Sequence, residues 1–220
     1  MKAPTSRVGG FTSPAIGRDY LSWSAIDLYR SCPLRYRFRY VDQLPEAVVA
    51  AGLAFGRSMH AALQRHYAAL ASGNGASEAD LAEAFRASWQ TSTDQQEIRY
   101  GQRETKEEFF ALAEQMLRAF REAPIATPPG RIIAVEEEFR GALGPGVPTL
   151  LGRVDLLLET QDALVVVDFK TSRSRWSEAQ VEQHADQLLL YGALLRCRST
   201  QPIQLQFVGL TKTKQTSVHI

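Results

Sequence analysis

The first half of the chain carries apolar residues at helical spacing. Four helices are expected, over about residues 22–32, 53–70, 77–90 and 104–122. In the second of these, apolar residues recur at intervals of three and four, which gives the helix one apolar face. The first helix should begin near Ser22 or Ser24, because Ser24 and Asp27 have the spacing of a capping box. Residues 1–20 contain Gly and Pro without periodicity and are expected to form a flexible leader.

The second half changes to strand patterning. Runs rich in Val, Ile, Leu and Phe predict strands over about residues 131–143, 149–160, 163–172 and 203–212. A long helix is expected over about 177–196, between the last two strands. Helices followed by a strand meander, a helix and a further strand indicate an α/β or α+β fold. We expect one domain over 21–220, in which a mostly helical part (21–125) packs against a sheet part (131–220).

Composition and charge narrow the class of protein. The 220 residues are 45% hydrophobic, which excludes wholesale disorder. No apolar run reaches the roughly 18 residues of a membrane span, and the N-terminal stretch lacks the apolar segment of a secretory signal, so we expect a cytoplasmic protein. A net charge of +1 means that any attraction for nucleic acid must come from a local patch. Two cysteines, Cys32 and Cys197, cannot form a disulfide framework or a four-cysteine metal site.

Two acidic residues on adjacent strands carry the first chemical signal. If Gln161-Asp162 is a two-residue hairpin turn, Asp155 lies directly opposite Asp168. Lys170 then points to the same face as Asp168, because side chains alternate along a strand. Facing carboxylates repel each other, and a divalent cation with oxygen ligands would compensate, with the lysine placed to bind a phosphate. The alternative is a surface hairpin in which Lys170 only neutralises Asp168.

Three other polar positions could join this site. One residue of Glu136–Glu138 should face the two aspartates, although a one-residue slip changes which one, and a solvated acidic edge is the alternative. His60 lies on the apolar face of its helix, either as a core histidine or as an imidazole ligand that suits manganese or magnesium in an oxygen-rich site. Gln187 and Tyr191 share one helix face and could touch a phosphate or support the lysine, but an ordinary amphipathic helix would show the same spacing.

Arginines and aromatic residues alternate at Tyr29-Arg30 and over 35–40, and Arg173, Arg175 and Trp176 closely follow the lysine. Arginines on phosphates and rings on unstacked bases suit single-stranded DNA. Over 35–40 the pattern favours instead aromatic residues in the core and arginines on a solvated face. For the second group it favours DNA contact, because that group adjoins the strand that carries the lysine.

Five motifs then follow an opening segment (21–41) in a fixed order. They are Gly56-Arg57-Ser58-Met59-His60, Val135-Glu136, Gly152-Arg153-Val154-Asp155, Val167-Asp168-Phe169-Lys170-Thr171 and Gln187-Leu188-Leu189-Leu190-Tyr191. With these motifs in this order, the chain resembles the PD-(D/E)XK nuclease superfamily. Within it, the chain resembles the RecB/AddB-like exonuclease branch, to which CRISPR adaptation nucleases are related. The resemblance implies a restriction-endonuclease-like core, with a central mixed β-sheet flanked by helices and an N-terminal helical lobe.

The resemblance also implies metal-dependent hydrolysis of DNA phosphodiester bonds. The implied ligands of Mg²⁺ or Mn²⁺ are His60, Asp155, Asp168 and the backbone carbonyl of Phe169. Lys170 would position and activate the attacking water or stabilise charge on the phosphorus. Gln187 and Tyr191 would contact DNA or orient Lys170, and Glu136 stands where the family has a motif glutamate.

We therefore expect a RecB-like exonuclease that acts on single-stranded DNA in repair or recombination, with a helicase or recombination protein as a further partner. The alternatives are a catalytically inactive DNA-binding or scaffold subunit, and a hydrolase of RNA or of small phosphoesters. Many relatives hold a four-cysteine iron–sulfur cluster. Cys32 matches its early cysteine, but Cys197 falls within the motif helix, so no complete cluster is expected. Relatives also continue beyond the strand near 205–210, so a compact variant and a piece of a longer protein both agree with the sequence.

Overall fold

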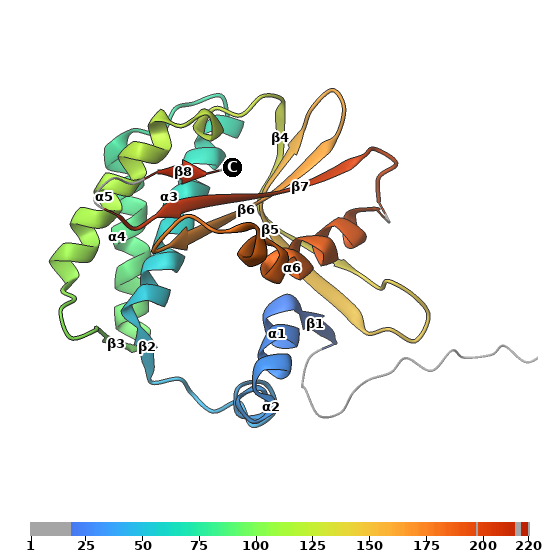
Figure 1. Ribbon diagram of the computed structural model, residues 1–220, viewed down its shortest axis with the longest axis horizontal. Coiled ribbons are helices and arrows are strands. Elements are labelled where there is room, and N and C mark those ends of the chain that lie inside the picture. The colour runs from blue at the N-terminus through green and yellow to red at the C-terminus, as the bar shows by residue number, and fades with distance from the viewer. Residues whose placement is uncertain (1–18, 197, 214–216, 220) are drawn as a thin grey trace, which may run out of the picture.

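A mixed β-sheet lies between two layers of helices (Figure 1). The computed structural model describes residues 19–196, 198–213 and 217–219. Helices α3 (Ala51–Ala71), α4 (Glu78–Gln95) and α5 (Lys106–Glu122) cover one face, and α6 (Glu178–Arg196) covers the other. The predicted α/β fold, with a central mixed sheet flanked by helices, is confirmed.

Strand β5 pairs with three other strands of the sheet. The strands are β1 (Tyr20–Ser22), β4 (Arg131–Gly141), β5 (Thr149–Glu159), β6 (Leu164–Ser172), β7 (Ile203–Thr211) and β8 (Val218–His219). β4 runs antiparallel along one edge of β5, and β6 pairs antiparallel with the other. β7 lies parallel to β6, which requires the crossover that α6 supplies. Glu159 pairs with Leu164, so the register expected from a two-residue turn is confirmed.

The N-terminal part begins with an unexpected strand. Tyr20, the last residue of the expected leader, begins β1. Residues 1–18 of that leader lie outside the described part of the chain. β1 is followed by α1 (Trp23–Ser31), α2 (Pro33–Tyr36) and the π-helical turn η1 (Arg37–Val41). The Ser22 hydroxyl caps α1 by accepting from the Ala25 N–H at 3.3 Å. The capping pair Ser24–Asp27 is therefore wrong, because pairing of β1 with β5 places the start of the helix directly after Ser22.

Three smaller elements complete the fold. Strands β2 (Val48–Ala50) and β3 (Glu97–Arg99) form a separate parallel pair, and η2 (Pro124–Ala126) is a 3₁₀ turn after α5. Capping boxes begin α4 and α5, where Ser77 and Thr105 accept from backbone N–H groups three residues later. Among the described helices, none combines the length and the apolar character that crossing a bilayer requires.

A buried aromatic contact fixes α3 against the sheet. The ring of Tyr67 on α3 stacks on Phe169 of β6, with centroids 5.6 Å apart, and its hydroxyl donates to the Ile125 carbonyl at 2.7 Å. Both rings are almost fully buried. Such side chains contribute about 1.5–3 kcal/mol each on burial. Because His60 lies two turns before Tyr67 on α3, this contact also sets the position of His60 relative to β6.

The sheet opens where β5 leaves β6. Cα pairing with β6 ends at Leu156–Val167, and pairing of the same edge with β1 covers only Thr149 to Leu151. The faces to which successive side chains of β5 point also change between these two ladders. Val154 packs in the cluster under α6 and Leu156 in the cluster under α3–α5, although residues two apart in a regular strand share a face. We call this opening, between residues 152–155 of β5 and 168–171 of β6, the β5–β6 fork.

Gly152 lets α6 approach the fork. A Cβ on this glycine would lie 2.7 Å from Cδ1 of Tyr191 and 3.2 Å from Cδ1 of Leu194. Both neighbours are buried side chains of α6. The first residue of the Gly152–Asp155 motif is therefore a packing requirement of the helix that carries Gln187 and Tyr191.

Gly152→Ala should destabilise the protein by about 1–3 kcal/mol, because the added methyl group overlaps the Tyr191 ring. Urea unfolding measures the change. The matched control is Gly209→Ala, also within a strand of this sheet, where a Cβ meets nothing within 4 Å. Equal stability of the two variants would show that α6 does not depend on this close approach.

Candidate active site

Three potential metal ligands meet at the fork. His60 on α3 places its Nδ1 3.4 Å from Oδ1 of Asp155 and 3.5 Å from Oε1 of Glu136. One ligand atom from each residue lies within 4.8 Å of the others, which is the spacing of groups that share an ion. Two carboxylates and one imidazole form an oxygen-rich set. We call these residues the His60 cluster.

Glu136 reaches this cluster through an unusual backbone conformation. Its φ is +51°, in the left-handed region that non-glycine residues rarely adopt. Val135 pairs with Leu156 and Glu137 with Val154, so Glu136 lies opposite Asp155. Its side chain is 10% exposed, whereas Glu137 and Glu138 are exposed residues. Strained backbone of this kind persists where surrounding contacts hold it and often marks a functional site.

Asp155 and Asp168 do not face each other as the extended register predicts. The ladder stops one pair earlier, and Oδ2 of Asp155 instead accepts from the Phe169 N–H at 2.7 Å. Two carboxylates that lie directly opposite each other across a ladder repel. In the fork, Asp155 and Asp168 bind different partners. The repulsive pairing inferred from sequence is therefore wrong for Asp168, and Glu136 lies opposite Asp155 in its place.

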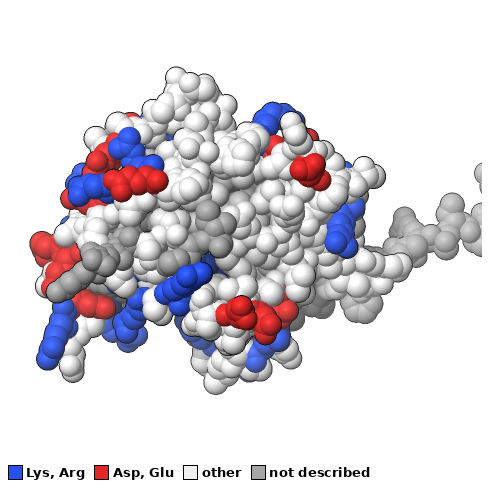
Figure 2. Space-filling view, turned by 45° about the horizontal axis from the view of Figure 1, so that its top comes forward, with Lys and Arg blue, Asp and Glu red and all other residues white. Residues whose placement is uncertain are grey.

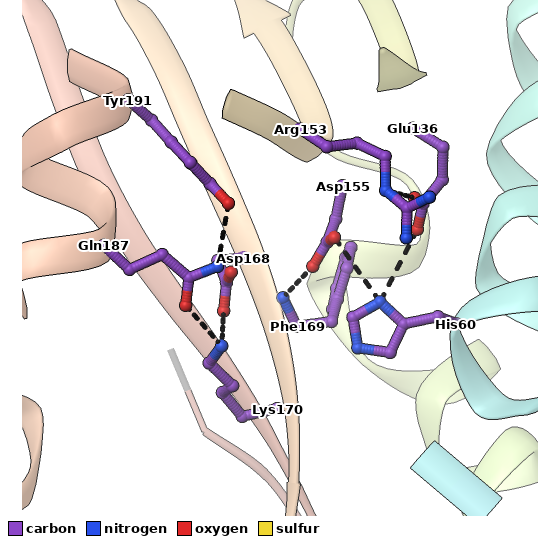
Figure 3. A network of polar contacts seen from close by, with 9 residues as sticks. All are labelled: His60, Glu136, Arg153, Asp155, Asp168, Phe169, Lys170, Gln187 and Tyr191. Atoms are coloured by element: carbon purple, nitrogen blue, oxygen red, sulfur yellow. Dashed lines mark hydrogen bonds and ion pairs between the residues drawn. The ribbon is translucent and has the colours of Figure 1, made fainter. Parts of the chain in front are cut away.

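Asp168 takes part in a second group, on the other side of β6 (Figure 3). Its Oδ2 lies 2.8 Å from Nζ of Lys170, and the Asp168 side chain is almost fully buried. The same ammonium donates to Oε1 of Gln187 at 2.9 Å. Gln187 in turn donates from its amide nitrogen to the Tyr191 hydroxyl at 3.0 Å. Lys170 is thus held by two partners, and we call these four residues the Lys170 group.

The charges of the two groups respond to burial and to each other. Burial lowers the pKa of His60, but the Asp155 and Glu136 carboxylates outweigh it and raise that pKa to about 10. A proton on His60 then supplies the positive charge that the two carboxylates require. Burial also raises the pKa of Asp168, to about 6; the Lys170 ammonium opposes this shift and the Asp155 carboxylate adds to it.

Two hollows meet at the fork. The α1-side hollow, about 350 Å³, is bordered by Trp23 and Tyr40 from the N-terminal part and reaches Asp155, Asp168 and Lys170. The α3-side hollow, about 580 Å³, runs along the exposed face of α3. Both include His60, Arg153 and Lys170 in their walls, so together they form one path across the site.

Comparisons with known proteins show the family and the fold of the chain. The sequence profile of the PD-(D/E)XK nuclease superfamily matches residues 20–219. The chain belongs to the PD-(D/E)XK nuclease superfamily. A candidate exonuclease from Eubacterium rectale, 13% identical, matches 99% of this chain and 77% of its own with a TM-score of 0.55, which shows a shared fold. The protein SSO0001, 14% identical, matches 89% of this chain and 76% of its own with a TM-score of 0.33. Among curated proteins, none matches the sequence.

As a PD-(D/E)XK nuclease, the protein belongs to a class of hydrolases that act on nucleic acids and generally use divalent metals. The His60 cluster fits such an ion, because its donors are two carboxylates and an imidazole within coordinating reach. An iron–sulfur cluster with four cysteine ligands does not fit, since the sequence has only two cysteines. Cys32 is exposed on the surface, and Cys197 lies outside the described residues.

The residues expected to contact nucleic acid after Lys170 lie in the loop between β6 and α6. Arg173 and Arg175 are exposed, and Trp176 is half-buried beside α6. The expectation that the aromatic residues of 35–40 belong to the core is wrong for Phe38, which is 43% exposed, and right for Tyr40. η1 is a short surface turn that buries only Tyr40, so the neighbouring ring remains outside. The face in Figure 2 carries small groups of both charges around a largely uncharged centre, in agreement with the net charge of +1.

Arg153 is a site residue for which the sequence patterns predicted no role. Its Nε lies 3.1 Å from Oε2 of Glu136, and its side chain is 61% exposed. It therefore stands at the junction of both hollows with its charge partly open to solvent. Its position in the sequence could have revealed it. Arg153 lies inside the Gly152–Asp155 motif, two residues before Asp155 on a strand and hence on the same face.

Asp168→Asn should stabilise the metal-free protein at pH 8. The folded-state pKa of about 6 exceeds the unfolded value of about 3.9, so stability is lost as the pH rises through 6 and the buried group ionises. We expect the variant to gain on the order of 1 kcal/mol at pH 8 in EDTA, and this gain to shrink as the pH falls below 6. Urea unfolding across this pH range measures it.

Asp162→Asn is the control, because Asp162 is exposed in the turn between β5 and β6 and the same substitution there should leave the stability unchanged. A wild-type protein that is as stable as Asp168→Asn at pH 8 would contradict the electrostatic account of the Lys170 group.

Proposed function

We propose that the protein is a divalent-metal-dependent deoxyribonuclease that hydrolyses single-stranded DNA, of the RecB/AddB-like exonuclease type. The observation that carries the proposal is the placement of the His60 cluster and the Lys170 group on either side of one strand, joined by the bond from the Phe169 N–H to Asp155. A cation site and a positioned ammonium thereby border the same path.

Each group has a distinct part in this proposal. His60, Glu136 and Asp155 would hold Mg²⁺ or Mn²⁺, with Asp168 and the Phe169 carbonyl, the other ligands expected from sequence, on the adjoining strand. When bound, the ion supplies Lewis acidity toward a phosphodiester and lowers the pKa of a water ligand. Lys170, held by Asp168 and Gln187, presents an ammonium to the oxygens of the scissile phosphate, where negative charge increases during attack.

The walls of the path favour an unpaired strand. Trp23 borders the α1-side hollow, and Tyr29 and Phe38 are exposed nearby in sequence beside arginines. Aromatic rings bind bases by stacking, which requires that the bases are not already stacked in a duplex. Arg153 stands where a phosphate would pass between the hollows.

The exonuclease mode and the biological setting rest on likeness. The five motifs in order, and the shared fold with a candidate exonuclease from Eubacterium rectale, support an exonuclease. The complete set of motif residues argues against an inactive scaffold subunit, which has no need of Lys170. A role in repair or recombination, a helicase partner and a cytoplasmic location stay predictions from the sequence.

Cleavage assays test the proposal. The wild-type protein should degrade linear single-stranded DNA with Mg²⁺ or Mn²⁺ and not in EDTA, faster than duplex DNA or RNA, and should spare circular single strands. Lys170→Ala should lower the rate at least about a hundredfold, because the transition state loses a positioned cation. Lys106→Ala, an exposed lysine at the start of α5, is the control and should retain the wild-type rate.

Full activity of both Lys170→Ala and Asp155→Asn would rule out this site. DNA retention without any cleavage would favour the inactive subunit, and cleavage of RNA in preference to DNA would redirect the substrate assignment.

Metal binding tests the His60 cluster separately. Glu136→Gln should weaken Mn²⁺ binding measured by calorimetry by about 10- to 100-fold, since one anionic ligand becomes neutral. Glu137→Gln makes the same change at the next residue of β4, which is exposed, and should bind Mn²⁺ as the wild type does. Equal affinities for the two variants would place the ion elsewhere.

A further inference from the structure

A third hollow, about 410 Å³, opens beyond Lys170 on the side of α6. Its walls come from the loop after β6, the first turns of α6 and strand β7. Lys170 belongs both to this hollow and to the α1-side hollow, so the two adjoin at the ammonium. We call it the Trp176 pocket. Its volume falls within the roughly 300–1,000 Å³ of pockets that hold small ligands.

Two aromatic rings form one wall of the Trp176 pocket. Trp176 contacts Phe207 edge-to-face, with centroids 5.3 Å apart, and its ring stacks on His184 of α6 at 4.6 Å. Phe207 also lies under the Lys170 ammonium, which is 5.8 Å from the ring centroid. His184 and Phe207 therefore hold Trp176 in place next to the proposed catalytic lysine. Val181, 40% exposed, adds an apolar side chain to the same space.

The pocket is left open by a glycine in the middle of β7. Gly209 pairs with Lys170 in the parallel β6–β7 ladder, so a side chain here would share the face of Lys170. A Cβ at this position meets nothing within 4 Å, and the φ of Gly209 is not in the positive range that would demand glycine. Glycine within a strand weakens it, and such a residue often marks the close approach of a ligand.

The charged residues of the pocket suit a nucleobase better than a phosphate. Arg175 and Lys170 supply cations, and Glu178 and Glu182 supply carboxylates from α6. Carboxylates repel a phosphate but accept from the exocyclic amino group or ring N–H of a base. The aromatic wall and the carboxylate acceptors suit the base of a nucleotide. The neighbouring Lys170 suits its phosphate.

We propose that the Trp176 pocket binds the unstacked base of a nucleotide next to the scissile phosphate, so that the strand is positioned by one base as well as by its backbone. This inference rests on the proposed function, because it takes a single-stranded substrate whose phosphate lies at Lys170. The base stacks against Trp176, and its edge faces Glu178 and Glu182.

An abasic scan tests the pocket. Single-stranded oligonucleotides that lack one base at successive positions are bound to the full chain in Ca²⁺ and followed by fluorescence anisotropy, and are then cleaved in Mg²⁺ or Mn²⁺. For the wild type, one position beside the cleaved bond should lose about 5- to 150-fold in affinity, the range for loss of a single base stack.

Two variants assign that position to the pocket. Trp176→Ala should weaken binding of the intact strand by a similar factor, and removal of the base should then change its affinity by less than about twofold. Gly209→Val fills the pocket from its floor and should behave in the same way, whereas Trp176→Phe, which keeps a ring, should retain most of the base dependence. Gly144→Val, in the loop between β4 and β5, is the matched control and should show the full wild-type abasic effect.

The outcomes separate the two proposals. If the protein cleaves DNA but no abasic position matters, or if Trp176→Ala and Gly209→Val keep the full abasic effect, the pocket proposal is overturned and the nuclease proposal stands. If no metal supports cleavage, the proposed function fails. In that case, an oligonucleotide affinity that depends on one base in the wild type but not in Trp176→Ala or Gly209→Val still supports a base-binding pocket. Because the two variants alter the pocket independently, failure of one to fold leaves the other as the test.

Discussion

Glu136 and Asp155 face each other on neighbouring strands, and the structure around them is arranged to tolerate their repulsion. The left-handed backbone at Glu136 and the bond from the Phe169 N–H to Asp155 direct both carboxylates toward His60. Like charges at this spacing destabilise a sheet unless a cation lies between them. In the protein alone, the proton on His60 and the Arg153 guanidinium supply that charge. A bound divalent ion would do so more strongly, which links the strain of the fork directly to the proposed chemistry.

The rest of the fold holds the two sides of the fork at a fixed distance. Tyr67 stacks on Phe169 and thereby ties α3, with His60, to β6. Gly152 lets Tyr191 pack on β5 and thereby ties α6, with Gln187, to the same strand. The two helices approach the sheet from opposite faces, and the opening between β5 and β6 is the place where their polar side chains come near each other. A continuous ladder there would separate His60 from Lys170 by an intact sheet.

Sequence reasoning predicted the regular elements well and the irregular ones poorly. Helical periodicity placed α3 to α6 within a few residues, and the β5–β6 register followed from one two-residue turn. The end of that ladder at Leu156 was not predictable, because the Phe169 N–H beyond it donates to the Asp155 side chain, a contact that exists only in the folded sheet. The same limit explains Glu136: a regular strand alternates, so no count along 136–138 shows which glutamate adopts φ +51°. β1 was missed because three residues are too few to show the alternation of a strand. Phe38 was assigned to the core because periodicity does not reveal that η1 lies at the surface.

We propose that the fork binds a cation through residues from three separate elements. Anomalous diffraction from a crystal soaked in Mn²⁺ measures this most directly, since the signal locates the ion without reference to activity. We expect one strong manganese peak coordinated by His60, Glu136 and Asp155. A manganese peak that contacts none of these three residues, in a crystal whose fork is otherwise as described, would contradict it.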